Sequence, residues 1–315
     1  MKRLDELLKE ECECNKLPFC GIETYHDSFY EILYGVISKK AHENHPIPEG
    51  IIIALSDITV ENCTKLKYYH ESTSDGERIF SYRVNGQKPG TLVFDIPISQ
   101  QVLIELVSEK DNHVVIITRK GNQTRVYYDS QISILEDRIW NVTPSLDTIL
   151  DSLSRIDNGS TLSEMNKLLS FAYYELSLNK IGSTIVFNNG RVINRYYEGG
   201  EILNLDFKKK YNKVILKNYL QTHDGAIVMD KKQCVRYGNV FLEYKKSDIR
   251  RIDKYEGTRH TSAACFSLAH KNIIAFVVSA DGGVSIFKEG KKIEELHYNM
   301  SSSGSFLIEW NKLQI

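Results

Sequence analysis

The sequence has no long hydrophobic run. Its longest apolar segments, Ile51–Leu55 and Ile273–Ala280, are much shorter than the ~20 residues that a membrane-spanning helix needs. Residues 1–13 are charged from the start and lack the apolar stretch and the small-residue cleavage site of a signal peptide. We therefore expect a cytoplasmic protein that does not enter a membrane.

The chain also lacks an excess of charge of either sign. It has 40 Lys and Arg residues against 41 Asp and Glu residues, and its formal net charge is -1. This balance provides no overall attraction for nucleic acid or for an anionic membrane. The short runs Lys208–Lys210 and Lys245–Lys246 are typical of solvated surface. We do not expect a nucleic-acid partner.

Cysteine is sparse, and its spacing is not that of a zinc site. Three of the six cysteines, Cys12, Cys14 and Cys20, lie close together but lack paired C-x2-C units. Free thiols are the favoured state in a cytosolic chain. A metal held by these three residues stays open as the alternative, and the sequence assigns them no role.

The length of 315 residues fits two domains. In the first half, helical patterns at 1–22, 27–36 and 98–107 accompany strand patterns at 51–55, 79–84, 91–96, 114–118 and 124–128. These elements predict a separate α/β or α+β domain over residues 1–145, which we interpret as a sensor or regulatory module. Turn-forming residues mark 146–160 as a connector.

The second half, residues 161–315, predicts an α/β domain. A capping box formed by Thr161 and Glu164 begins a helix with an apolar stripe that ends before Gly182. Further patterns predict a second helix at 262–269 and strands at 183–187, 226–229, 234–242, 272–279 and 284–288. A central mixed sheet flanked by helices is the expected architecture.

Three polar turns of the second half lie next to these strands. They are His223–Ala226, Gly257–Ser262 and Ser279–Gly283. Ligands gather at strand ends, where loops converge. A carboxylate, an Arg-His pair and a Ser/Asp turn together suit a metal-bound triphosphate, so the pattern indicates a nucleotide site.

Taken in order, these segments resemble the diadenylate cyclase (DAC) domain. Asp224-Gly225-Ala226 is similar to the family's Asp-Gly-Ala motif, and Gly257–Thr261 is similar to its Gly-Thr-Arg-His-Arg motif. Supporting similarity lies in Leu176–Gly182, Asn239–Leu242 and Val278–Gly283. The resemblance covers about residues 162–290, nearly half of the chain, and does not extend to residues 1–150.

The resemblance implies an enzyme that condenses two ATP molecules into cyclic di-AMP and two pyrophosphates. It implies a homo-oligomer in which two DAC domains face each other, and Mg²⁺ or Mn²⁺ as cofactor. Asp224 would activate the 3′-hydroxyl, and a phosphate-holding loop would span Gly257–Ser262. The implied catalytic residues are Asp224, Arg259 and His260, the implied metal ligands are His223 and Asp281, and the implied ATP contacts are Gly225, Ala226, Leu242, Gly257, Thr258, Thr261, Ser262 and Ser279.

One departure from the family pattern leaves a second function open. Thr261 stands where the family usually has Arg, and a charge-assisted contact to phosphate contributes about 1.5–3 kcal/mol. The alternative is therefore a nucleotide-binding sensor on a DAC scaffold that no longer cyclises. Asp281 keeps a carboxylate where the family has Glu, but on a shorter side chain.

Overall fold

The structure is a computed structural model that describes residues 3–22, 28–38, 49–58, 60, 63–66, 74–108, 113–137, 139–143, 162–190, 200–296 and 299–300. It divides into two compact units. The described residues up to Thr143 and the strand β16 (Asn299–Met300) form the first, and residues 162–296 form the second. The expected second domain ran to residue 315, whereas β16 pairs with the sheet of the first unit. The predicted connector at 146–160 lies outside the described residues.

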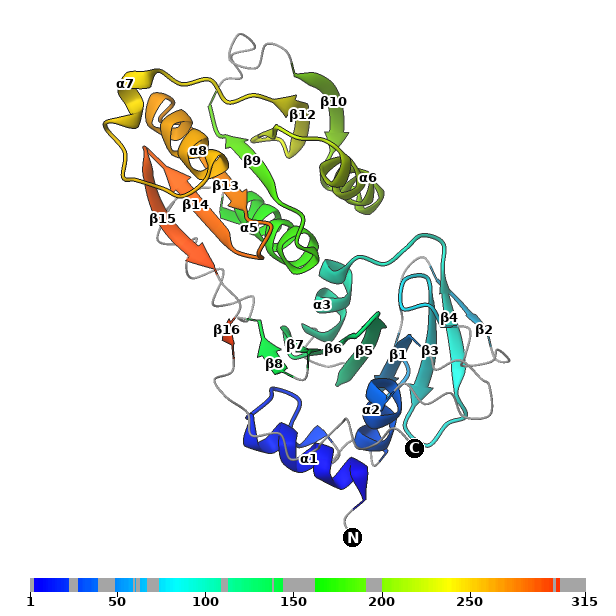
Figure 1. Ribbon diagram of the computed structural model, residues 1–315. Helices are drawn as coiled ribbons and strands as arrows, with labels where there is room; N and C mark the ends of the chain where they lie inside the picture. Colours follow the sequence, from blue (N-terminus) through cyan, green and yellow to red (C-terminus); the bar gives the residue numbers. More distant parts are fainter. Residues whose placement is uncertain are drawn as a thin grey trace. The chain divides into compact units, whose positions relative to one another are not determined.

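The first unit is built on a nine-stranded mixed sheet with the order β16-β8-β7-β6-β5-β1-β3-β4-β2 (Figure 1). Only β1 and β3 pair in parallel, and the other neighbours are antiparallel. The sequence patterns miss four of these strands, β2, β7, β8 and β16. The bounds are β1 Gly50–Ala54, β2 Cys63–Leu66, β3 Ile79–Val84, β4 Gly90–Phe94, β5 Val114–Lys120, β6 Gln123–Tyr128, β7 Gln131–Glu136 and β8 Ile139–Val142.

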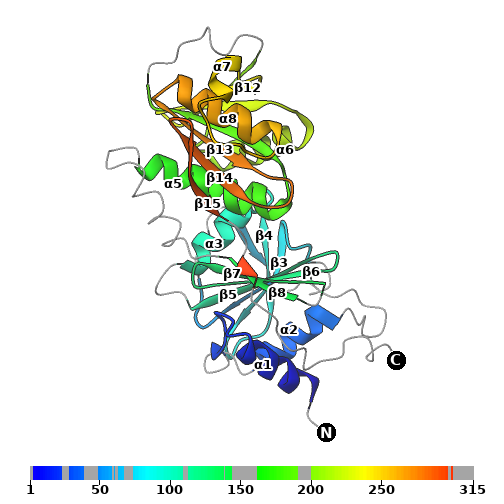
Figure 2. The same cartoon turned by 60° about the vertical axis from the view of Figure 1, so that its left-hand side comes forward.

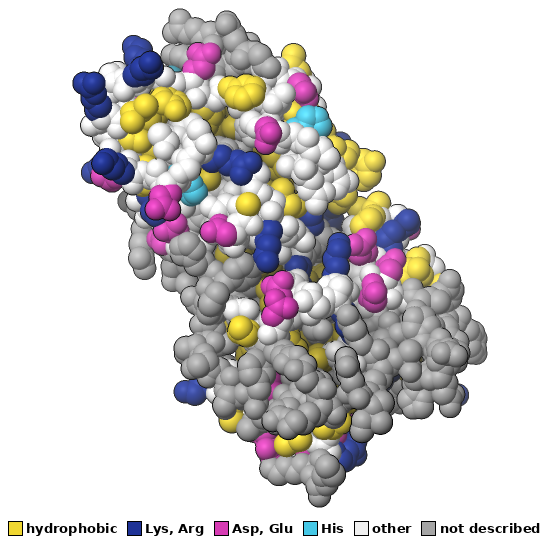
Figure 3. Space-filling view, viewed as in Figure 1, with side chains coloured by type: hydrophobic (Ala, Val, Ile, Leu, Met, Phe, Trp, Pro, Cys, Tyr) yellow, Lys and Arg dark blue, Asp and Glu magenta, His cyan; other side chains and the backbone are white. Residues whose placement is uncertain are grey.

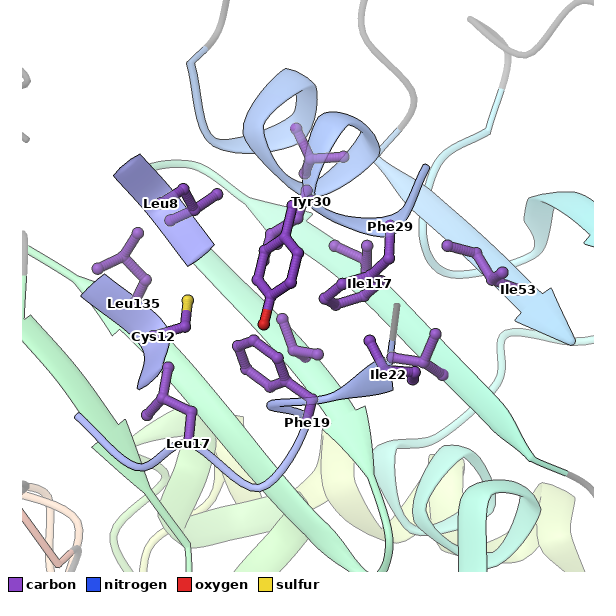
Figure 4. Packing of buried hydrophobic residues seen from close by; sticks show 14 of the residues in the cluster. Leu8, Cys12, Leu17, Phe19, Ile22, Phe29, Tyr30, Ile53, Ile117 and Leu135 are labelled. Carbon is purple, nitrogen blue, oxygen red and sulfur yellow. The ribbon is translucent and has the colours of Figure 1, made fainter. Parts of the chain in front are cut away.

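Helices cover both faces of this sheet. Helices α1 (Leu4–Cys14) and α2 (Phe29–Ser38) lie on one face, and α3 (Gln100–Ser108) lies on the other (Figures 1 and 2). Apolar side chains from α1, α2 and the turn between them pack on the strands (Figure 4). Trp140 closes this core, and its Nε1 donates to the buried Glu11 Oε1 at 3.2 Å.

The second unit contains a seven-stranded mixed sheet with the order β10-β12-β11-β9-β13-β14-β15. Strands β9 and β11 are parallel, and every other neighbouring pair is antiparallel. This confirms the predicted mixed sheet; β10 and β15, at its edges, are additional strands. The bounds are β9 Ser183–Asn188, β10 Glu201–Asp206, β11 Ala226–Asp230, β12 Cys234–Val240, β13 Ile273–Val278, β14 Val284–Lys288 and β15 Lys291–Leu296.

Helix α8 (Thr258–Ala269) lies on one face of this sheet, and α5 (Leu162–Ser170) lies on the other (Figure 2). The helix predicted after residue 161 is not uniform, because α5 continues as the π-helical turn η3 (Phe171–Leu176) and the 3-10 turn η4 (Ser177–Asn179). All six residues of η3 are buried, so this segment belongs to the core. The remaining helices are α6 (Lys210–Thr222) and α7 (Lys246–Ile249).

All six cysteines are free thiols. Cys12 is buried within the core of the first unit, and burial raises the pKa of its thiol, with further contributions from Cys20 and Glu11. A buried thiol with a raised pKa behaves as a small apolar side chain rather than as a nucleophile.

The face of the second unit that Figure 3 shows carries basic and acidic side chains interspersed, in keeping with the balanced composition. Among the residues that the structure describes, no helix combines the length and apolar character needed to cross a membrane.

Candidate active site at one edge of the second sheet

The strand register brings the predicted segments to one end of the strands of the second sheet. This end, at which β9 and β11 begin, is called the edge below. In the parallel pair, Thr184 of β9 lies opposite Ala226 of β11, so both strands begin at this edge. Strand β12 runs the other way, with Val240 opposite Ala226, so it ends there. Leu242 follows directly after that end. Segments that are far apart in the sequence therefore meet because of the topology.

The turn between β13 and β14 belongs to the same edge. Val278 of β13 lies opposite Ser183, which begins β9. The turn Ser279–Gly283 follows Val278 and is closed by a hydrogen bond from Ser279 N to Gly283 O at 2.8 Å. Asp281 lies at its exposed tip. Arg259, in the polar turn Gly257–Ser262, lies 3.7 Å from Asp224. A Cβ on Gly182 would contact both Arg259 and Ala280, so the three polar turns are neighbours in space.

Gly225 sets the course of the chain beside Asp224. Its φ is +89°, and a Cβ at this position would lie 2.8 Å from the carbonyl carbon of Asn239 in β12. Only glycine combines this backbone conformation with such a close approach. Asp224 therefore leaves the sheet edge on a tight turn, and its side chain is 92% exposed.

Asp224 and Arg259 face each other at this edge. Arg259 Nη2 lies 3.7 Å from Asp224 Oδ1. Both side chains line a hollow of about 530 Å³. This volume is within the range of small-molecule sites. Its lining residues are Lys180, Ile181, Gly182, Leu220, Gln221, Thr222, His223, Asp224 and Arg259.

The predicted loop Gly257–Ser262 is largely the start of a helix. Helix α8 begins at Thr258, four residues before the expected position, and Gly257 is its N-cap with φ +86°. The polar composition and leading glycine favoured a loop. However, Thr261 Oγ1 donates to Gly257 O at 3.1 Å and Ser262 Oγ donates to Arg259 O at 3.0 Å, so both hydroxyls are satisfied within the helix.

This helix start is suited to an anion. No side chain caps the N-terminus of α8, and Thr258 and Arg259 are exposed beside it. The first N–H groups of a helix have no intrahelical acceptor, and the helix dipole is positive at this end. A phosphate group near Arg259 would therefore find both a guanidinium and backbone donors.

His260 is half-buried behind this edge. Its Nε2 lies 3.2 Å from Ser285 Oγ, and its ring packs against Phe287 with 5.8 Å between centroids. Burial is the largest effect on its pKa, which is lowered from the usual value, and Lys292 also lowers it. The ring is therefore held in place rather than free in solvent.

His223 has an environment that fits the predicted metal role. Its ring stacks on Tyr219 with 4.1 Å between centroids, and its Nδ1 lies 3.1 Å from the carbonyl oxygen of Tyr219. Nδ1 also lies 2.9 Å from the Thr222 hydroxyl. When Nδ1 carries the hydrogen and donates it to the Tyr219 carbonyl, Nε2 has the lone pair that a metal needs.

Carboxylates near this edge also fit an Mg²⁺ or Mn²⁺ ion. Asp224 and Asp281 are exposed and available as oxygen donors. Among the described residues, no three His, Cys, Asp or Glu side chains gather into a closed cage. Mg²⁺ is usually bound by one or two carboxylates together with substrate phosphates, so such a cage is not needed.

Other predicted ATP contacts lie at the edge without lining the hollow. Leu242 is half-buried and packs on the apolar cluster that contains Ala226. The residues Leu242, Ala226, Ser262 and Ser279 are not among those that line the hollow. The structure thus brings Asp224, Arg259 and His223 to the hollow itself and the remaining predicted residues to its surroundings.

The sequence patterns missed two residues that shape this site. Gly182 was part of the family resemblance over Leu176–Gly182 and was given no place in the site, but a Cβ there would be 2.5 Å from Arg259 Nη1. Lys180 lines the hollow from a left-handed backbone conformation with φ 56°. Their position directly before β9, the strand paired with β11, was the signal that could have identified them.

Most of the second unit matches a known protein family. Residues 170–292 match the model of the DAC family, described as DisA bacterial checkpoint controller nucleotide-binding. This match confirms the resemblance that the motifs indicated. No curated protein matches the chain.

Two solved structures are similar to part of the chain. One is a double mutant of DacA from Staphylococcus aureus, with 21% identity and a TM-score of 0.32, over 49% of this chain and 87% of that one. The other, described as a hypothetical membrane spanning protein from Bacillus cereus, has 21% identity and a TM-score of 0.35, over 48% and 77%.

Proposed function

Because residues 170–292 form a DAC domain, we propose that the protein is a diadenylate cyclase. In this reaction two ATP molecules condense into cyclic di-AMP and release two pyrophosphates. Each 3′-oxygen forms a bond to the α-phosphorus of the other nucleotide as the bond to pyrophosphate breaks. The observation that carries the proposal is the pairing of Asp224 with Arg259 at a hollow of small-molecule size.

Each group at the hollow has a role that its chemistry supports. Asp224 is an exposed carboxylate and accepts the proton of the attacking 3′-hydroxyl. Arg259 and the start of α8 hold phosphate oxygens and stabilise the charge that develops on them. A divalent cation, when bound, would neutralise phosphate charge, and His223, Asp224 and Asp281 are the residues suited to hold it.

The reaction requires two nucleotides in opposed orientation. The hollow at Asp224 and Arg259 would hold one nucleotide, so we include in the proposal that two copies face each other in a homo-oligomer. The rate should then rise with more than the first power of protein concentration wherever the oligomer dissociates. The regulatory role of the first unit stays a prediction.

The test is incubation with ATP and Mn²⁺, followed by detection of cyclic di-AMP by mass. We expect product from the wild type and none from Asp224→Asn, with unchanged thermal unfolding because Asp224 is exposed. Glu289→Gln is the matched control, because Glu289 is exposed in the turn after β14, at the end of the strands opposite the candidate site.

The same experiment separates the two candidate functions. The hydroxyl of Thr261 is engaged with the carbonyl of Gly257, which is the observation that favours a non-cyclising sensor. Tight ATP binding by the wild type without any cyclic di-AMP would refute the cyclase and support the sensor.

A further inference from the structure

A chain of polar groups connects His260 to β15, the last strand of the second sheet. His260 Nε2 lies 3.2 Å from Ser285 Oγ, and this hydroxyl donates to Glu295 Oε1 at 3.1 Å. Ser285 and Glu295 are directly opposite each other in the β14–β15 pair, so their side chains lie on the same face. The register of this hairpin therefore builds the chain.

The available hydrogens determine the direction of each hydrogen bond. An ionised carboxylate only accepts, and a serine hydroxyl has one hydrogen to donate. Ser285 donates that hydrogen to Glu295, so its oxygen accepts from His260. Nε2 therefore carries a hydrogen, and in the neutral ring Nδ1 has the lone pair.

The other ring nitrogen is the one near the candidate phosphate site. A Cβ built on Gly257 would lie 4.0 Å from His260 Nδ1, which places Nδ1 beside the N-cap of α8. Ser285 is buried, so the side of the ring that it holds is screened from solvent. The two nitrogens thus face different environments.

We propose, resting on the proposed function, that Ser285 and Glu295 are positioning residues that hold His260 with Nε2–H toward Ser285 and Nδ1 toward ATP. In the neutral ring Nδ1 is a hydrogen-bond acceptor at the start of α8. In the charged ring Nδ1–H donates to a phosphate oxygen while Nε2–H keeps its bond to Ser285. The pair acts on the nucleotide only through His260.

The surrounding charges are consistent with this coupling. Burial lowers the pKa of His260 most, and among the charged groups Glu295 has the largest effect and raises it. Lys292 Nζ binds the second carboxylate oxygen of Glu295 at 2.5 Å and so fixes its orientation. The charged groups that act on the ring are Glu295 and Lys292 of β15, Asp281 of the β13–β14 turn and Arg259 of α8.

The test is ¹⁵N NMR of the histidine rings in the full chain without nucleotide, with His260→Gln to assign the signal. We expect the wild type in the Nε2–H tautomer when neutral and a mixed tautomer in Ser285→Ala. Glu295→Gln removes a negative charge near the ring and should lower the pKa of His260. Glu294→Gln is the matched control, because Glu294 lies opposite Ile286 and not Ser285.

The outcomes separate this inference from the proposed function. A wild-type Nδ1–H tautomer, or an unchanged pKa of His260 in Glu295→Gln, overturns it. Expected NMR shifts together with a pH profile of ATP binding that does not move in Glu295→Gln overturn its functional part. Expected NMR shifts and a shifted binding profile without cyclic di-AMP support the positioning role and refute only the cyclase.

Discussion

The close approach of Gly182 to Arg259 predicts a substitution that weakens ATP binding but leaves the free energy of unfolding almost unchanged. A Cβ at Gly182 would lie 2.5 Å from Arg259 Nη1 and 3.4 Å from the nitrogen of Ala280. The second distance is ordinary contact, whereas the first is about 1 Å too short for carbon and nitrogen atoms. Gly182→Ala therefore displaces the end of a flexible side chain and leaves the backbone in place.

The magnitude follows from the hydrogen bonds that Arg259 would make. A displacement of about 1 Å breaks a hydrogen bond, and one to a charged group contributes about 1.5–3 kcal/mol. We therefore expect Gly182→Ala to weaken ATP binding by about 10- to 150-fold. The free energy of unfolding should change by less than about 1 kcal/mol, because the backbone does not have to shift.

The assay is calorimetric titration with ATP, together with urea unfolding. In an Arg259→Ala background, Gly182→Ala should have almost no further effect on ATP affinity, since the side chain that it displaces is gone. Gly35→Ala controls for the change itself, because a Cβ there meets nothing within 4 Å. Wild-type affinity in Gly182→Ala, or an equal loss in the Arg259→Ala background, would refute the reasoning.

Three further predictions concern stability and the start of α8. Gly225→Ala should lower the free energy of unfolding by at least about 2 kcal/mol, because φ +89° and the backbone of Asn239 both oppose a Cβ; a loss under about 0.5 kcal/mol in urea contradicts this. Thr261→Ala should change ATP affinity less than about threefold, since its hydroxyl already donates to Gly257 O; a tenfold loss in calorimetry would show contact with ATP. Burial lowers the pKa of His270, so the unfolded chain binds more protons just below about pH 6.5 and stability falls on acidification; His270→Gln should reduce this slope in urea unfolding, and an unchanged slope is the contrary result.

Local patterns were sufficient for much of the second unit. The alternation and β-branched runs predicted β9, β11, β13 and β14, because buried strands impose their composition over a few residues. The motif around Asp224 and that around Arg259 indicated the DAC family, whose model matches residues 170–292, since such short glycine-containing motifs in a fixed order leave few alternatives.

Edge strands and the first residues of helices were harder to predict from the sequence. Strand β10 has no fully buried residue, so it lacks the continuous apolar, β-branched run that marks the buried strands of this sheet. The start of α8 was predicted as a loop because its residues are polar. In the structure their hydroxyls donate to carbonyls of the same helical turn, and the local sequence pattern does not reveal these hydrogen bonds.

The sequence by itself determined the family resemblance, because Asp224-Gly225-Ala226 and Gly257–Thr261 are contiguous and their composition is distinctive. Only the tertiary structure decided what surrounds them. Gly182 beside Arg259, and Glu295 behind His260 through Ser285, depend on strand order and register. These contacts join residues tens of positions apart, and pairing across a sheet is a property of the whole fold rather than of any segment.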